Sequence, residues 1–298
     1  MAVQGSVQSV QSSRASLAAT DLKMSYATIM VHVDVNGELN GRVQIARELA
    51  GRFESRLIGI SSWMPRPPFA LEGVVIDPAL TEEDLASRTA WLKKRGDAFR
   101  TAVGLEVGRV DWRCSQEFPG EYIAREARAA DLVVIGRERE AFDPYVFPEP
   151  GAFLLRVGRP VLVVPPGARS LSGRRIVVAW KDTRESRRAV QDALPFLQRA
   201  DQVIMAEVCE GSDDVGPSQA RLRDVTAYLL AHGITAVTER VTPVEGTAAN
   251  SLLRLVQDES ADLIVAGAYG HSRLGEWIFG GMTHALLQES PVCCLFSH

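Results

Sequence analysis

Four glycines near the C-terminus are spaced G-x2-G-x9-G-G: Gly267, Gly270, Gly280 and Gly281. Gly267 ends the apolar run ADLIVAG, and the last two glycines open the helical pattern MTHALLQES. A helix N-terminus offers free backbone N–H groups and a partial positive charge, and glycine lets the backbone approach a ligand closely. The spacing therefore predicts a phosphate cradle. The alternative is that the first pair only allows a tight turn and the second only close packing.

Three side chains in and just after this loop could contribute to such a site. Arg273 and His271 lie between the glycine pairs and could reach a phosphate, a charge-assisted contact for which arginine is well suited. They could equally be solvated loop residues. Thr283, two residues after Gly281, could offer a hydroxyl group to the phosphate or help to cap the helix.

Other chemistry-bearing patterns are sparse. The 5 histidines lack metal-ligand spacing, and neither G-x-S-x-G nor a P-loop motif occurs. The 4 cysteines form no C-x-x-C motif. Cys293 and Cys294 are adjacent in a strand-like run, so they should point to opposite faces as small core residues. We expect a reducing compartment, no bound metal and no dedicated enzyme.

Composition also restricts the partners. The 298 residues carry a formal net charge of −4, so no basic field favours nucleic acid or an anionic membrane. No apolar run approaches the roughly 20 residues that span a bilayer. Residues 1–25 lack the apolar core of a secretory signal and are interpreted as a disordered leader, or as an extension before a start at Met24. A cytoplasmic protein is expected.

The elements that position these residues belong to an internal repeat. AADLVVIG ends at Gly136 and SADLIVAG at Gly267, 131 residues later, and RPVLVVP and SPVCCLF are separated by the same 131. Nearer the N-terminus, ATIMVHVD matches RIVVAWK at a separation of 147. The difference of 16 indicates an insertion, and the Pro-rich stretch 62–80 is the obvious one. It could cover the site of the first copy or be an ordinary surface excursion.

Two copies of one domain follow, at 26–166 and 174–298, with a linker at 167–173. In the second copy, strand patterns at 175–180, 202–209, 235–241, 262–266 and 291–297 alternate with helical patterns at 184–198, 217–232 and 247–258 and from about 281. Val190, Ala193, Leu194 and Leu197 form the stripe of a helix that covers a sheet. Such alternation predicts doubly wound α/β domains with a parallel sheet buried on both faces.

The C-terminal stretch GAYGHSRLGEWIFGGMTHALLQESPVCCLFSH resembles the signature of universal stress proteins, whose nucleotide-binding branch carries G-x2-G-x9-G-[ST]. VHVD, AADLVVIG and RPVLVVPP resemble the same family in the first copy. The resemblance implies a tandem universal stress protein with five-stranded parallel sheets sandwiched by helices. It also implies an adenine nucleotide such as ATP, with or without Mg²⁺, as ligand. Domains of this family pair through their last strand, so the two copies can pair with each other.

The second copy departs from the binding pattern at two places. Gly281 stands where family binders have Ser or Thr, which removes a hydroxyl group from the phosphate site. Lys181 stands where they have an Asp at the end of the first strand; Asp182 could replace that Asp only if the register slips by one. The neighbouring Trp180 could stack on a base or fill the pocket.

The first copy departs in the opposite way. It keeps the Asp, as Asp34, but has GREREAFDPYVFPEPG in place of the glycine loop. Arg137 and Arg139 flank the start of that loop, and only Gly151 remains near the later glycines. We therefore expect the first copy not to bind nucleotide.

Together these features predict a stress-response protein whose second domain binds ATP as a sensor or as a stabilising ligand. Slow ATP hydrolysis stays open. The alternative is a family member without nucleotide that acts through contacts with an unknown protein partner, and a third possibility is another ligand in a remodelled pocket. The two domains are expected to pair within the chain, and a homodimer is also conceivable.

Overall fold

The computed structural model describes residues 24–35, 41–67, 69–71, 74–76, 81–137, 143–209, 215–270 and 281–298. The expected leader lies outside these residues, apart from Met24 and Ser25. None of the helices in these ranges combines the length and the apolar character that a membrane crossing needs.

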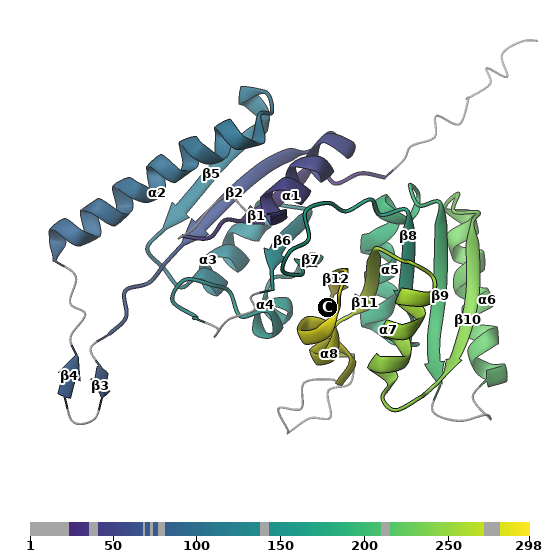
Figure 1. Cartoon of the computed structure of the whole chain (residues 1–298). Helices are drawn as coiled ribbons and strands as arrows, with labels where there is room; N and C mark the ends of the chain where they lie inside the picture. Colours follow the sequence, from purple (N-terminus) through teal and green to yellow (C-terminus); the bar gives the residue numbers. More distant parts are fainter. Residues whose placement is uncertain are drawn as a thin grey trace, which may run out of the picture.

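Strands and helices alternate along both halves of the chain (Figure 1). The first half comprises β1 (Thr28–His32), α1 (Gly41–Arg52), β2 (Arg56–Ser62), β3 (Phe69–Leu71), β4 (Val74–Ile76), α2 (Glu82–Val103), β5 (Val110–Ser115), α3 (Pro119–Glu126), β6 (Leu132–Gly136), α4 (Pro150–Arg156) and β7 (Val161–Val164). The second half comprises β8 (Arg175–Ala179), α5 (Arg184–Leu197), β9 (Gln202–Cys209), α6 (Val215–Ala231), β10 (Val237–Pro243), α7 (Ala248–Asp258), β11 (Leu263–Gly267), α8 (Gly281–Glu289) and β12 (Cys293–Ser297).

A single 10-stranded sheet, of order β10-β9-β8-β11-β12-β7-β6-β1-β2-β5, runs through both halves. Neighbouring strands within each half are parallel. Where the halves meet, β12 pairs antiparallel with β7, and Leu295 lies opposite Leu162. Each half has the same order, with its first strand between its second and fourth. The predicted α/β class with doubly wound parallel sheets is confirmed.

Helices cover both faces of the sheet because successive strand residues alternate between two cores. Ile29 and Val31 share a core with buried residues of α1, α2, α5 and α6, whereas Met30 shares one with residues of α3, α4, α7 and α8. Cys293 and Cys294 are divided in the same way, as predicted. Burial raises the pKa of each thiol to about 12, so both behave as core groups.

The helix α5 shows how the sequence pattern becomes packing. Thr183 is its N-cap, and its side-chain oxygen accepts a hydrogen bond from the Ser186 N–H. The predicted stripe is buried: Val190, Ala193, Leu194 and Leu197 are at most 2% exposed. Polar side chains occupy the opposite face, as in a helix laid on a sheet.

The insertion has more structure than its sequence suggested. Ser62 still belongs to β2, and the short strands β3 and β4 pair as an antiparallel hairpin. In Figure 1 this hairpin stands away from the 10-stranded sheet. The start of the insertion joins a core: Trp63 is 2% exposed and packs with Val35 and Leu92.

Candidate functional site

The order of the strands defines where a ligand would lie. In the second half β8 lies between β9 and β11, so the chain direction across the sheet reverses between β8 and β11. Open α/β sheets bind ligands beyond the carboxyl ends of the strands at this switch point. There the structure brings together Lys181 after β8, Gly267 and Gly270 at the end of β11, and the first turns of α5 and α8.

The first two glycines face the start of α5. A Cβ on Gly267 would lie 2.6 Å from the carbonyl carbon of Glu185 and from the Ser186 nitrogen. A Cβ on Gly270 would lie 3.0 Å from Thr183 Oγ1 and 3.1 Å from Glu185 Oε2. Gly267 is thus required for close packing of β11 on the helix. The glycine spacing predicted that the backbone comes close to a ligand. At Gly267 the group that the backbone approaches is the start of α5.

The start of the loop is anchored on two sides. The Ala268 N–H donates to the Ser297 carbonyl at 2.8 Å, and His298 Nδ1 lies 3.0 Å from the Ala268 carbonyl oxygen. The Tyr269 N–H donates to Thr283 Oγ1 at 3.2 Å. The end of β12 and the first turn of α8 therefore fix residues 268 and 269.

The two residues of α8 that were predicted to contact phosphate, Thr283 and Gly281, differ in their exposure. Thr283 is 4% exposed, and its hydroxyl oxygen joins the two ends of the glycine loop through the Tyr269 N–H. Gly281 is exposed, and among the described residues nothing lies within 4 Å of the position of a Cβ. Gly280, Arg273 and His271 lie outside the described residues.

The residues after β8 also separate into distinct roles. Lys181 is exposed, and its ammonium group makes no hydrogen bond or ion pair with any residue that the structure describes. Asp182 pairs with Arg187 at 2.5 Å on the surface. Trp180 is 7% exposed and belongs to the core that contains α5. Its side chain is thus a core group.

Glu185 is the site residue that the sequence prediction missed. Its side chain is buried, with the residue 4% exposed, beside Gly270 in the first turn of α5. Burial works to raise its pKa, but hydrogen bonds from Arg184, from its own N–H and from Thr183 outweigh this and lower the pKa. The site therefore contains a carboxylate that compensates the N-terminus of α5. An acidic residue in the first turn of the helix after β8 was the available signal.

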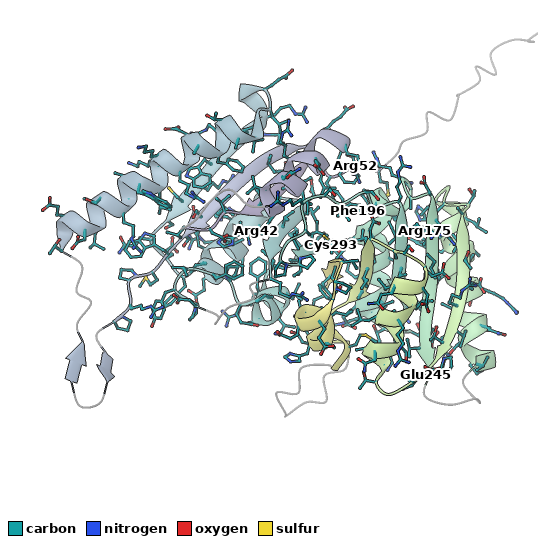
Figure 2. The ribbon with its side chains drawn as sticks, viewed as in Figure 1. Arg42, Arg52, Arg175, Phe196, Glu245 and Cys293 are labelled. Atoms are coloured by element: carbon teal, nitrogen blue, oxygen red, sulfur yellow. The ribbon has the colours of Figure 1, made fainter. Side chains whose placement is uncertain are left out.

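At the switch point of the first half, Arg42 contacts several neighbouring groups. Arg42, 3% exposed, forms an ion pair with Asp34, and its guanidinium lies 5.5 Å from the centre of the Phe147 ring. The same guanidinium touches the position that a Cβ on Gly136 would occupy. Figure 2 shows Arg42 inside the first half. The carboxylate of Asp34 is thus engaged by an arginine of its own half.

His32 lies beneath this pair. Its ring is fully buried and meets Phe147 edge-on, with ring centres 5.0 Å apart. Burial, and then the charge of Arg42, lower the pKa of His32 to about 3, against the opposing effect of Asp34. The pKa of Asp34 is lowered as well: burial opposes this, but the charge and the hydrogen bond of Arg42 prevail.

A doubly wound sheet with glycines and helix N-termini at its switch point is an architecture that suits small anionic ligands. Residues 173–297 match the model of the Universal stress protein family. The second half is therefore a universal stress protein domain. No curated protein sequence matches the chain.

Two solved structures share the fold over nearly the whole chain. A universal stress protein from Archaeoglobus fulgidus DSM 4304 is 14% identical, with a TM-score of 0.66, over 91% of this chain and 95% of that protein. A functionally unknown protein from Pseudomonas aeruginosa PAO1 is 17% identical, with a TM-score of 0.59, over 94% of each chain. At these identities the likeness concerns the fold, including its arrangement in two halves.

Proposed function

We propose that the second half binds an adenine nucleotide, ATP, beyond the ends of β8 and β11, and that the protein acts in a stress response with this nucleotide as sensed or stabilising ligand. The proposal rests on the second half being a universal stress protein domain and on the geometry of its switch point. The observation that supports it most directly is at the N-terminus of α8. None of the described residues lies within 4 Å of the position that a Cβ on Gly281 would take. Free N–H groups at such a terminus favour a phosphate.

Lys181 supplies a second favourable feature. Its exposed ammonium group has no partner among the described residues and follows the central strand of the half. An ammonium group binds phosphate as a point charge. In this proposal Lys181 contributes charge to the phosphates in place of the Asp that family binders direct at the ribose and base.

Glu185 requires that a cation accompany the nucleotide. An ionised carboxylate beside Gly270 repels phosphate oxygens unless a cation lies between them. Mg²⁺ prefers carboxylate and phosphate oxygens as ligands, so Glu185 is the residue of this edge that would hold it. Binding is therefore expected to be stronger with Mg²⁺ than in the presence of a chelator.

Calorimetric titration of the full chain tests the proposal. Mg-ATP should give saturable heats, and Lys181→Ala should weaken binding about tenfold or more, since charged hydrogen bonds contribute about 1.5–3 kcal/mol. Lys94→Ala, at an exposed position of α2 in the other half, is the matched control and should bind as the original chain does. Absence of binding up to millimolar Mg-ATP would refute the proposal.

A gain of affinity is the sharper test. Gly281→Ser restores the hydroxyl of family binders at a position with room for it, and should tighten binding about threefold to tenfold by adding one hydrogen bond. Gly120→Ser is the control, because Gly120 also lies in the first turn of a helix with nothing within 4 Å of a Cβ. Equal or weaker binding by Gly281→Ser would remove α8 from the phosphate site.

Three observations favour the alternative, a domain that acts through a protein partner without nucleotide. Trp180 is packed in the core and unavailable for stacking on a base, and Glu185 places negative charge beside the glycine loop. Large apolar side chains are also exposed on α6, at Val215, Tyr228 and Leu230. If neither ATP, ADP nor AMP binds, this alternative replaces the first.

A further inference from the structure

Tyr269 connects the glycine loop of the second half with the first half. A Cβ on Gly151, at the start of α4, would lie only 2.6 Å from the Tyr269 hydroxyl oxygen. The phenol therefore sits directly on the first turn of α4. Glu149 caps that turn by accepting the N–H of Gly151 at 2.9 Å. Burial, and then the charge of Glu149, raise the pKa of Tyr269 to about 12, so the phenol stays neutral.

The backbone of Tyr269 is held in an unusual conformation. Its φ is +57°, in the left-handed region that residues with a Cβ rarely adopt. Such a conformation persists where surrounding contacts determine it. Here those contacts are the bond from its own N–H to Thr283 and the bonds of Ala268 to the end of β12.

These anchors belong to the junction between the halves. β12 pairs with β7, and α4 and α8 pack against each other beside this pair of strands (Figure 1). Gly151 is open to the Tyr269 hydroxyl because it has no side chain of its own. A residue with a Cβ at this position would collide with the Tyr269 hydroxyl.

We propose that Tyr269, seated on Gly151, is a positioning residue through which the first half sets the backbone geometry of residues 268–270, where the glycine loop of the second half begins. Gly270 is the next residue along the chain, so a change in the seat of Tyr269 moves the start of the loop. The conformation of α4 and the affinity of the loop for its ligand are then coupled, and the coupling is reciprocal. The expected effect on ligand affinity rests on the proposed nucleotide function. The coupling between α4 and the conformation of residues 268–270 does not depend on that function.

Gly151→Ala tests the contact between Tyr269 and Gly151, because the added methyl group collides with the Tyr269 hydroxyl. It should weaken Mg-ATP binding about tenfold, within the usual range for coupled sites. Tyr269→Phe removes the hydroxyl oxygen with which the methyl group collides. The double variant should therefore bind more tightly than Gly151→Ala alone, a rescue that general destabilisation would not give. Gly120→Ala, a first-turn glycine in open space, is the control and should change nothing.

Hydrogen exchange separates this inference from the proposed function. Without any nucleotide, Gly151→Ala should speed amide exchange in residues 268–270, and the double variant with Tyr269→Phe should exchange more slowly than Gly151→Ala alone. If the original chain binds no nucleotide but the exchange changes as expected, the nucleotide function fails and the coupling stands. Unchanged exchange and unchanged affinity in folded Gly151→Ala would overturn the coupling. If Gly151→Ala does not fold, Tyr269→Phe alone should still speed exchange at 268–270, and unchanged exchange there would overturn it.

Discussion

At the scale of single residues, the surroundings of Asp34 in the first half show how a carboxylate can be engaged by a neighbouring side chain. Asp34 stands at the end of β1, where a ligand-binding domain would direct a free carboxylate at its ligand. The guanidinium of Arg42 pairs with it, and Arg95 Nε donates to its backbone carbonyl at 2.9 Å. The first half thus has the aspartate, but its carboxylate is paired with Arg42. The contribution of the Asp34–Arg42 pair to the stability of the protein can be measured.

Asp34→Asn should destabilise the protein strongly, because it leaves the Arg42 charge, 2% exposed in its side chain, without a counter-ion. Breaking such a buried pair costs about 3–5 kcal/mol. Asp182→Asn is the matched control: its pair with Arg187 is exposed on both sides and should contribute less than about 1 kcal/mol. Urea unfolding measures both. Similar losses in the two variants would contradict the assignment of Arg42 as a buried, dependent charge.

His32 should make the stability depend on acidity. Burial holds its folded pKa at about 3, whereas the unfolded chain binds a proton below about pH 6.5. Between these values the unfolded state holds more protons, so stability falls as the pH falls, by at most about 1.4 kcal/mol per pH unit from this group. His32→Leu should flatten that part of the profile. Urea titrations at pH 7, 6, 5 and 4 compare the slopes, and equal slopes would contradict the prediction.

At the scale of elements, much of the fold was predictable. The β-branched runs and the stripe of α5 predicted the strands and helices of the second half closely, because parallel strands and their covering helices carry strong periodicities. The hairpin of β3 and β4 was not predicted, since three-residue strands leave no measurable period. Nor could sequence show the contact of Tyr269 with Gly151 or the burial of Glu185, because both depend on how distant segments pack.

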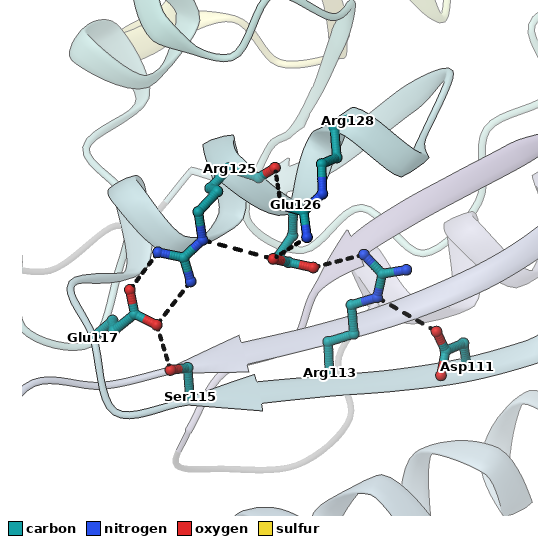
Figure 3. Close-up of polar contacts among 7 residues, drawn as sticks. All are labelled: Asp111, Arg113, Ser115, Glu117, Arg125, Glu126 and Arg128. Carbon is teal, nitrogen blue, oxygen red and sulfur yellow. Dashed lines mark hydrogen bonds and ion pairs between the residues drawn. The ribbon is translucent and has the colours of Figure 1, made fainter.

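The edge strand β5 is tied to α3 by a network of charges (Figure 3). The carboxylate of Glu126 is its centre: it lies 2.7 Å from Arg113 and 3.0 Å from Arg128. Arg125, 3.7 Å away, also forms a two-bond pair with Glu117. Charged side chains along an edge strand also discourage pairing with another sheet.

Glu126→Gln should reduce the free energy of unfolding by about 1–3 kcal/mol, because it removes an ionic hydrogen bond to Arg113 and leaves neighbouring arginines to repel each other. Its control is Glu121→Gln on the same helix. The Glu121 carboxylate lies 3.9 Å from Arg156, and both side chains are about two-thirds exposed, so almost no change is expected. Chemical denaturation distinguishes the two, and a loss as large in the control would contradict the network as a source of stability.

At the scale of the whole molecule, the two halves are joined at three levels. β12 pairs with β7 in the middle, and Tyr269 rests on α4 at the carboxyl ends of the strands. At the other end, Phe196 of α5 packs edge-on against Phe53 of the first half, with ring centres 5.2 Å apart. The ring of Tyr26 completes this aromatic cluster, 5.6 Å from Phe196. Figure 2 places Phe196 near Arg52, at the junction of the halves.

Arg52 reinforces the same junction. Its guanidinium donates to the carbonyls of Leu171 and Ser172, both at 2.7 Å, and so ties α1 to the segment that links the halves. The linker is therefore held on the first half before the chain enters β8. Together with the continuous sheet, these contacts predict that the protein unfolds as one cooperative unit and not as two independent domains.

Phe196→Ala should break that cooperativity. Phe196 is 1% exposed, and truncating a buried Phe costs about 3–5 kcal/mol through lost burial and the cavity left behind. Because the lost contacts cross the junction, the single calorimetric transition of the original chain should separate into two. Phe99→Ala is the matched control: Phe99 is equally buried but packs against Trp112 within the first half. It should lower the melting temperature of the chain but leave a single transition. If Phe196→Ala melts in one transition whose calorimetric and van't Hoff enthalpies agree, the aromatic cluster does not couple the halves, and the paired strands β7 and β12 alone would have to do so.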